Sequence, residues 1–105
     1  MGDKEIDALA LRVVEMCKKR GWSMHWTHRG AYLHLEASEL IEAIRGKYGD
    51  PCDEAGDVLL VLMSITEYAG IPFSQVLSAA EAKLQWLEVA PQYQNEETAR
   101  EEQPQ

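Results

Sequence analysis

The chain has 105 residues, of which 46% are hydrophobic and 27% charged, and its formal net charge is -8. This length suits a single domain, and the apolar fraction excludes global disorder. The acidic balance argues against a protein that binds nucleic acid, because the phosphate backbone requires a basic face. A small phosphorylated ligand stays compatible with it, because metal ions reverse the local sign of the charge.

Two features bear on the compartment in which the chain works. Its longest apolar run, Val58 to Met63, is far shorter than the about 20 residues that cross a bilayer, and the first residues lack an apolar signal segment. Cys17 and Cys52 have no neighbouring cysteine or histidine at zinc spacing, so we expect reduced thiols. The sequence therefore predicts a cytoplasmic protein with no membrane partner.

Four successive segments carry apolar residues at helical spacing, and none shows the sustained alternation of a strand. The first predicted helix covers about residues 4–20, with Asp3 as its cap and Gly21 as its end. The second starts at a Thr27 cap and reaches about Arg45. The apolar stripe of this second helix consists of Leu33, Ala37, Leu40, Ile41 and Ile44.

The third predicted helix has the clearest start, with Asp50 as N-cap and Pro51 as the first helical residue, and it runs to Ala69. It is apolar on nearly all sides over residues 58–63, so we expect it to be central. The fourth begins near Phe73 and ends before Pro91. We therefore expect a helical domain over residues 1–91 and a polar, largely disordered tail over 92–105.

Four carboxylates are placed unusually on the middle two helices. Glu36 and Glu39 are three residues apart on the second, and Glu54 and Asp57 repeat this spacing on the third. Both pairs border faces that should pack inward, where converging carboxylates repel one another unless they are protonated or bind cations. A cluster of oxygen ligands suits a hard cation, Mg²⁺ or Mn²⁺.

Roles without a hard cation fit these acids less well. Exposed acids in a first turn would account for Glu54 alone, because a helix N-terminus favours negative charge, but not for two pairs. Glu42 lies further round its helix and is expected to pair with Arg45. A di-iron bundle requires Glu-x-x-His, whereas the residues at i+3 here are Glu39 and Asp57.

Two stretches carry a resemblance to a known family. The first is WTHRGAYLHLEASELIEAI, residues 26–44, and the second is DEAGDVLLVL, residues 53–62. Together they resemble the MazG family of all-α nucleoside triphosphate pyrophosphohydrolases, which is related to all-α dUTPases and dCTP pyrophosphatases. The E-x-x-E … E-x-x-D pattern gains specificity because its second half opens a helix with a long apolar run.

This resemblance implies a fold, a cofactor and a reaction. The fold would be an all-α bundle of four or five helices that forms a homodimer or a dimer of dimers. By position, Glu36, Glu39, Glu54 and Asp57 would be ligands of Mg²⁺ (or Mn²⁺), with Glu39 also the base that activates water. Attack on the α-phosphorus would give a nucleoside monophosphate and pyrophosphate.

The resemblance also points to substrate-binding residues. Lys83 matches a phosphate-binding lysine on the last helix, although a structural role, with its stem lying on apolar surface, fits this lysine equally well. The arginine that commonly follows in the family is missing here, which leaves Arg29 or a residue of a second copy as its replacement.

Several aromatic residues and a histidine are further candidates for contacts with the nucleotide. Trp26 and His28 lie where relatives contact the base, and His28 with Arg29 at a helix start can meet a phosphate. Trp86 could be a base platform or a dimer contact, and Trp22 is expected in the core or an interface.

The sequence therefore predicts an Mg²⁺-dependent pyrophosphohydrolase of ribo- or deoxynucleoside triphosphates. The alternative is a non-catalytic helical module that binds a nucleotide or a partner and retains the acidic cluster. A purely structural bundle is a third possibility, and it predicts that neutralising the cluster affects only stability.

Overall fold

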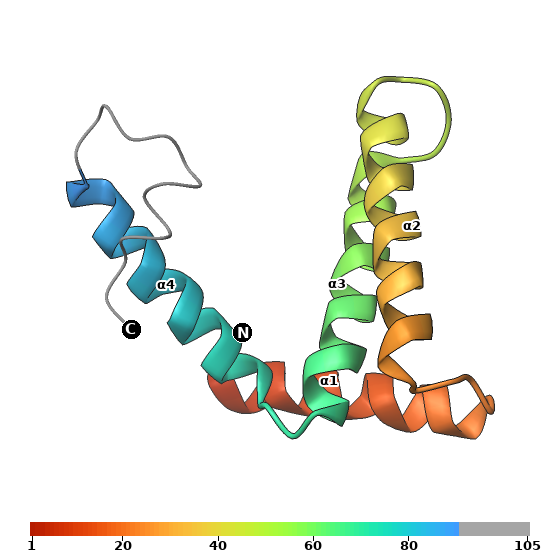
Figure 1. Ribbon diagram of the computed structural model, residues 1–105, viewed down its shortest axis with the longest axis horizontal. Helices are drawn as coiled ribbons and strands as arrows, with labels where there is room; N and C mark the ends of the chain where they lie inside the picture. Colours follow the sequence, from red (N-terminus) through yellow and green to blue (C-terminus); the bar gives the residue numbers. More distant parts are fainter. Residues whose placement is uncertain (91–105) are drawn as a thin grey trace. The chain divides into compact units, whose positions relative to one another are not determined.

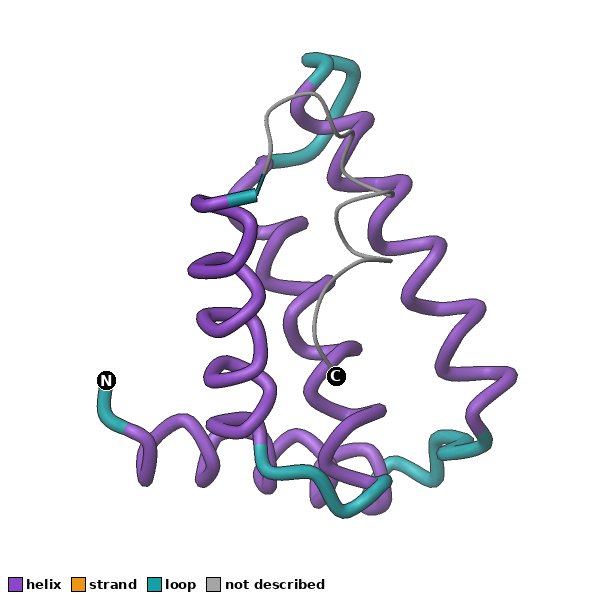
Figure 2. The backbone as a smooth tube through the Cα atoms, turned by 60° about the vertical axis from the view of Figure 1, so that its left-hand side comes forward, coloured by secondary structure: helices purple, strands orange, loops and turns teal. Residues whose placement is uncertain are grey.

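The structure is a computed structural model, and it describes residues 1–90 of the chain. Four α-helices make up this part: α1 (Asp3–Lys19), α2 (Trp26–Ile44), α3 (Pro51–Tyr68) and α4 (Phe73–Val89). Figures 1 and 2 show helices joined by short loops, with no strand among the described residues. The prediction of an all-α fold with four helices is confirmed, whereas the predicted tail, residues 92–105, lies outside the described residues.

The chain divides into two compact units, Met1–Phe73 and Ser74–Gln105. The first unit contains α1, α2 and α3, and the second contains α4 from Ser74 onward. The expected extent of the helical domain, residues 1–91, stays a prediction. All contacts described below lie within the first unit.

Two predicted helix caps are wrong, and one is confirmed. Gly2, not Asp3, is the N-cap of α1, and its N–H donates to Glu5 Oε2 at 2.6 Å. His25, not Thr27, caps α2, because its Nδ1 accepts from the Thr27 N–H at 3.2 Å. Asp50 caps α3 as predicted, with its carboxylate accepting from the Asp53 N–H at 3.1 Å.

Within the first unit, α3 is the central helix, as its apolar sequence predicts. It contacts both α1 and α2, and Figure 1 shows α2 and α3 side by side, with α1 crossing one end of the pair. Only these two neighbours cover α3 within the unit, and Leu59 and Leu60 therefore stay partly exposed. The buried apolar residues of the core are Ala10, Val13, Val14, Cys17, Ala43, Met63 and Phe73.

The apolar stripe predicted for α2 is buried only in part. Leu33 and Leu40 are half-buried, but Ile41 and Ile44 are exposed, Ile44 to 61%. The reason is the arrangement of the helices, because the second half of α2 extends beyond α1 and only α3 packs against it within the unit (Figure 1). The expectation that these two isoleucines pack inside the unit is therefore wrong.

The length and apolar content of the helices decide whether one of them could span a membrane. Among the described residues, none of the four is both long and apolar enough to cross a bilayer by itself. On length and composition, α3 and α4 meet the requirement only when they are taken together.

Candidate functional site

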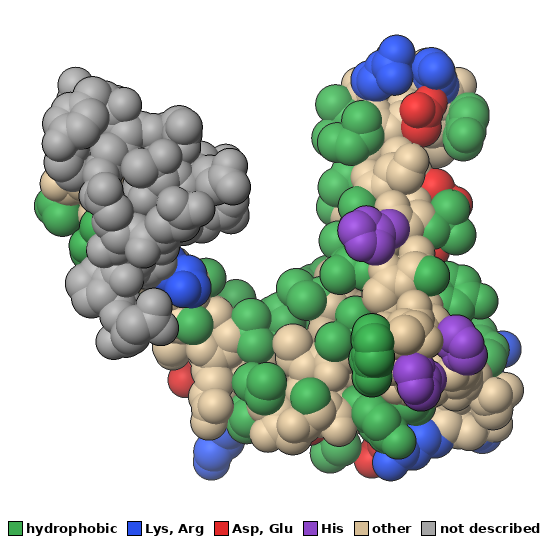
Figure 3. All heavy atoms as spheres, in the orientation of Figure 1, with side chains coloured by type: hydrophobic (Ala, Val, Ile, Leu, Met, Phe, Trp, Pro, Cys, Tyr) green, Lys and Arg blue, Asp and Glu red, His purple; other side chains and the backbone are tan. Residues whose placement is uncertain are grey.

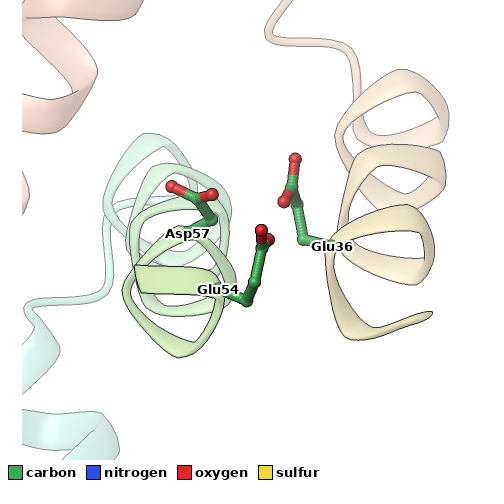
Figure 4. Close-up of side chains that lie close together, drawn as sticks. All are labelled: Glu36, Glu54 and Asp57. Atoms are coloured by element: carbon green, nitrogen blue, oxygen red, sulfur yellow. The ribbon is translucent and has the colours of Figure 1, made fainter. Parts of the chain in front are cut away.

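Three acidic side chains from two helices point toward one another in the first unit. Figure 4 shows Glu36 reaching from α2 toward Glu54 and Asp57, which leave α3. Glu54 and Asp57 lie on one side of α3 because residues three apart occupy neighbouring positions on a helix. The packing of α2 against α3 therefore brings together the two halves of the sequence pattern.

The start of α3 fixes where Glu54 lies. The Asp50 cap and Pro51 in the first turn define the first residue of the helix, and Glu54 follows within that turn. Gly49, just before the cap, has φ +85°, and a Cβ built on it would lie 3.0 Å from Glu54 Oε1. Glycine at this position therefore allows the loop both its left-handed backbone and close approach to the Glu54 carboxylate.

The geometry of the three acids fits a cation. One carboxylate oxygen from each of Glu36, Glu54 and Asp57 lies within 4.8 Å of the others. Glu36 Oε2 and Glu54 Oε2 are buried and have no hydrogen-bond partner among the described residues, and no lysine or arginine of Met1–Phe73 forms a salt bridge with the three acids. Buried carboxylate oxygens without donors need compensation, and a hard divalent cation supplies it.

The electrostatics of the cluster agree with this interpretation. Burial raises the pKa of Glu36, and the negative charges of Glu39, Asp57 and Glu54 raise it further. Burial likewise raises the pKa of Glu54, together with the charges of Glu39, Asp57 and Asp53. The folded chain therefore holds these two carboxylates in an environment that disfavours their charged forms until a cation offsets the repulsion.

The other two glutamates of α2 differ in their surroundings. Glu39 is half-buried, and its negative charge is among the causes that raise the pKa of both Glu36 and Glu54, so it stands beside the three-residue cluster. Glu42 forms salt bridges with Arg45 at 3.8 Å and Lys47 at 3.3 Å. The predicted pairing of Glu42 with Arg45 is confirmed, and Glu42 takes no part in the cluster.

A cavity of about 300 Å³ adjoins the acidic cluster. Glu36 and Asp57 form one part of its wall, and Trp22, Arg29 and Tyr32 form another. Residues of α1 also contribute to the lining. The remaining lining residues are Val13, Met16, Cys17, Leu60 and Val61.

The predicted substrate-binding residues are placed differently from one another. Arg29 lines this cavity and also a second one, whose lining includes Tyr68 and Trp26, the latter 75% exposed. His28 is exposed, and its Nδ1 lies 2.6 Å from Ser23 Oγ. Lys83 and Trp86 lie on α4, in the second unit, and their role stays a prediction.

Two cavity residues were not among the predicted site residues. Trp22, which the sequence favours as a core or interface residue, is half exposed and not in the core. Tyr32 lies four residues before Glu36 and three after Arg29, so all three share one side of α2. That spacing from Glu36 is the sequence signal that could have identified Tyr32.

The sequence matches a known family of enzymes. The family model described as the MazG nucleotide pyrophosphohydrolase domain matches residues 27–88, more than half of the chain. This range includes both pairs of carboxylates. Neither a curated protein nor a solved structure matches the chain.

Proposed function

The chain belongs to the MazG nucleotide pyrophosphohydrolase family, and from this premise we propose that it hydrolyses nucleoside triphosphates to nucleoside monophosphates and pyrophosphate, with Mg²⁺ or Mn²⁺ as cofactor. The observation that carries the proposal is the convergence of Glu36, Glu54 and Asp57 within 4.8 Å, with two buried carboxylate oxygens that have no partner.

The roles of the acids follow from their positions. Glu36, Glu54 and Asp57 would hold the cation, with Glu39 beside them as a fourth ligand or as the base that takes a proton from the attacking water. A bound Mg²⁺ or Mn²⁺ ion neutralises charge on the phosphates and makes water a better nucleophile. The adjacent cavity would receive the nucleoside, because its wall is mainly apolar and aromatic.

We also propose that the chain forms a homodimer or a dimer of dimers. Exposed apolar side chains on α2 and α3, Leu35, Ile41, Ile44 and Leu59, support association, and Figure 3 shows hydrophobic side chains along this helix pair. Association would cover an apolar surface that a small domain leaves open. Light scattering on the purified chain tests this, and a monomer at all working concentrations would contradict it.

The proposed reaction is tested by replacing one acid inside the cluster and one outside it. Asp57→Asn is expected to lower pyrophosphate release by a factor of at least about 100, because it removes a ligand of the cation, with helical circular dichroism retained. Glu42→Gln, on the same helix as Glu36 but outside the cluster, is the matched control and should keep the wild-type rate. Wild-type activity in the Asp57→Asn variant would refute the assignment of the site, and metal-dependent nucleotide binding without hydrolysis by the wild type would favour the non-catalytic module.

A further inference from the structure

Arg29 is a buried cation without a carboxylate partner. Its side chain is 6% exposed, although it belongs to the first turn of α2, and no salt bridge in residues 1–90 includes it. Buried arginines are normally paired with an anion, and a helix N-terminus disfavours positive charge. The described fold therefore leaves the positive charge of Arg29 without an anionic partner.

The guanidinium group is held firmly and has one nitrogen to spare. Nε donates to the Ser23 carbonyl at 3.0 Å, Nη1 donates to Ser64 Oγ at 3.2 Å, and the group lies 5.1 Å from the centre of the Tyr32 ring. No hydrogen bond within the described residues uses Nη2. Arg29 also lines the cavity beside the acidic cluster, so a ligand in that cavity can reach the guanidinium group.

The surroundings of Arg29 suit a nucleobase better than a triphosphate. Arg29 is the only cationic residue that lines the cavity, and its neighbours include Trp22, Tyr32 and aliphatic side chains. A triphosphate carries several negative charges and requires several cations, whereas a planar base is satisfied by aromatic and aliphatic walls. We therefore assign the Arg29 end of the cavity to the base and the carboxylate end to the phosphates.

The distance along α2 agrees with this orientation. Arg29 precedes Glu36 by seven residues, which corresponds to about 10 Å along the helix axis and to the same helical face. If the α-phosphate of a nucleotide lies at the carboxylates, the edge of its base that is farthest from the sugar would face Arg29. That edge carries an oxygen at position 4 of uracil and position 6 of hypoxanthine, and an amino group at those positions of cytosine and adenine.

We propose that Arg29 selects nucleotides whose base presents a carbonyl oxygen at this far edge, a preference for keto over amino bases that rests on the proposed function. Arginine only donates hydrogen bonds, so its free Nη2 can pair with a carbonyl oxygen. An amino group in the same place would bring two hydrogen-bond donors together, and neither could accept from the other. The buried polar groups left unpaired would weaken the free energy of binding by about 1–3 kcal/mol. This corresponds to a discrimination of about 5- to 150-fold.

The test measures binding and turnover with nucleotides that differ at this edge. Calorimetry with Mg²⁺ compares the α,β-imido analogues of dUTP and dCTP, and then those of ITP and ATP, while hydrolysis of the four natural triphosphates gives kcat/KM. The wild type is expected to bind each keto analogue at least about tenfold more tightly than its amino partner. Arg29→Met should reduce the ratio to about 2 or less, whereas the exposed-arginine control Arg12→Met should keep it.

Each outcome separates this inference from the proposed function. Hydrolysis without a keto preference would overturn the inference and leave the proposed function standing. A keto preference in binding without hydrolysis would overturn the proposed function and leave the inference standing. A wild type that binds none of the analogues would overturn the inference and the proposed function together. An Arg29→Met protein that binds all four analogues more weakly but keeps the ratio would place Arg29 on the phosphates and overturn the inference.

A variant that fails to fold does not remove the test. The wild-type ratios stand independently of any substitution, and Arg29→Gln offers a milder change whose side-chain amide both donates and accepts hydrogen bonds. Because this amide can pair with either base edge, the variant is expected to bind the keto and amino analogues about equally. A wild-type ratio near 1, or one in favour of the amino bases, would overturn the inference by itself.

Discussion

Replacing Glu36 by glutamine is expected to stabilise the metal-free protein and to weaken its stabilisation by Mg²⁺. Carboxylate oxygens of Glu36 and Asp57 lie within 4.8 Å of each other. At 4.8 Å, two unit charges repel by about 0.9 kcal/mol in water and about 3.5 kcal/mol at an effective dielectric constant of 20. Both groups are partly accessible to solvent, so we expect a gain of about 1 kcal/mol, or about 4–8 °C in Tm for a domain of this size.

Magnesium should stabilise the wild type more than the Glu36→Gln variant. An ion present at about 100 times its Kd stabilises the wild type by about 2.7 kcal/mol, which corresponds to about 10–20 °C in Tm. The Glu36→Gln variant lacks one of the three converging ligands and should show less than about half of this shift.

Differential scanning calorimetry with EDTA and with Mg²⁺ measures both quantities, and Glu42→Gln serves as the control. Glu42 is on the same helix but forms salt bridges with Arg45 and Lys47, so its replacement should not stabilise the protein and should leave the Mg²⁺ shift unchanged. Equal Mg²⁺ shifts in the wild type and in Glu36→Gln, or a metal-free Glu36→Gln protein less stable than the wild type, would refute the reasoning.

Three further predictions concern pH, the loop before α3 and the α3 cap. The pKa of Glu36 is raised in the folded state above its ordinary value of 4.5, so the contribution of Glu36 to the free energy of unfolding is largest below pH 4.5 and is lost as pH rises through the raised pKa. Thermal melting in EDTA at a series of pH values should show this loss of stability. A Glu36→Gln protein that loses the same stability over this pH range would contradict the prediction. Gly49→Ala should weaken Mg²⁺ binding by calorimetry more than Gly46→Ala, since both glycines have positive φ but only a Cβ at Gly49 meets Glu54; equal losses would disprove this role of the loop. Asp50→Ala should lower the free energy of unfolding in urea by about 1 kcal/mol through the lost cap, and an unchanged midpoint would show that the cap does not contribute.

Local chemistry made the start of α3 predictable. Asp50 and Pro51 act through their own backbone neighbours, so the sequence alone is enough to place the cap, and with it the first-turn position of Glu54. The cap of α2 follows a less common pattern, because a histidine takes the position and Thr27 supplies the N–H. Cap preferences favour hydroxyl and carboxylate side chains, which is why the sequence pointed to Thr27.

Tertiary packing determined what the sequence did not reveal. Helical periodicity identifies an apolar stripe, but it does not show how far the neighbouring helices extend, and Ile44 is therefore exposed. In the same way, the E-x-x-E … E-x-x-D spacing indicated which acids share a helix face, whereas the approach of Glu36 to Asp57 depends on the packing of α2 against α3. The burial of Arg29 ran against the usual exposure of arginine, and only the fold reveals it.

The most direct test of the proposed function is the identity of the products. The wild type is incubated with a panel of ribo- and deoxynucleoside triphosphates in Mg²⁺ and in EDTA, with the Glu39→Gln protein beside it, and the products are separated by chromatography. We expect equal amounts of nucleoside monophosphate and pyrophosphate, formed only with Mg²⁺ and only by the wild type. Release of inorganic phosphate with a nucleoside diphosphate, activity in EDTA, or full activity in Glu39→Gln would contradict the proposed reaction at this carboxylate cluster.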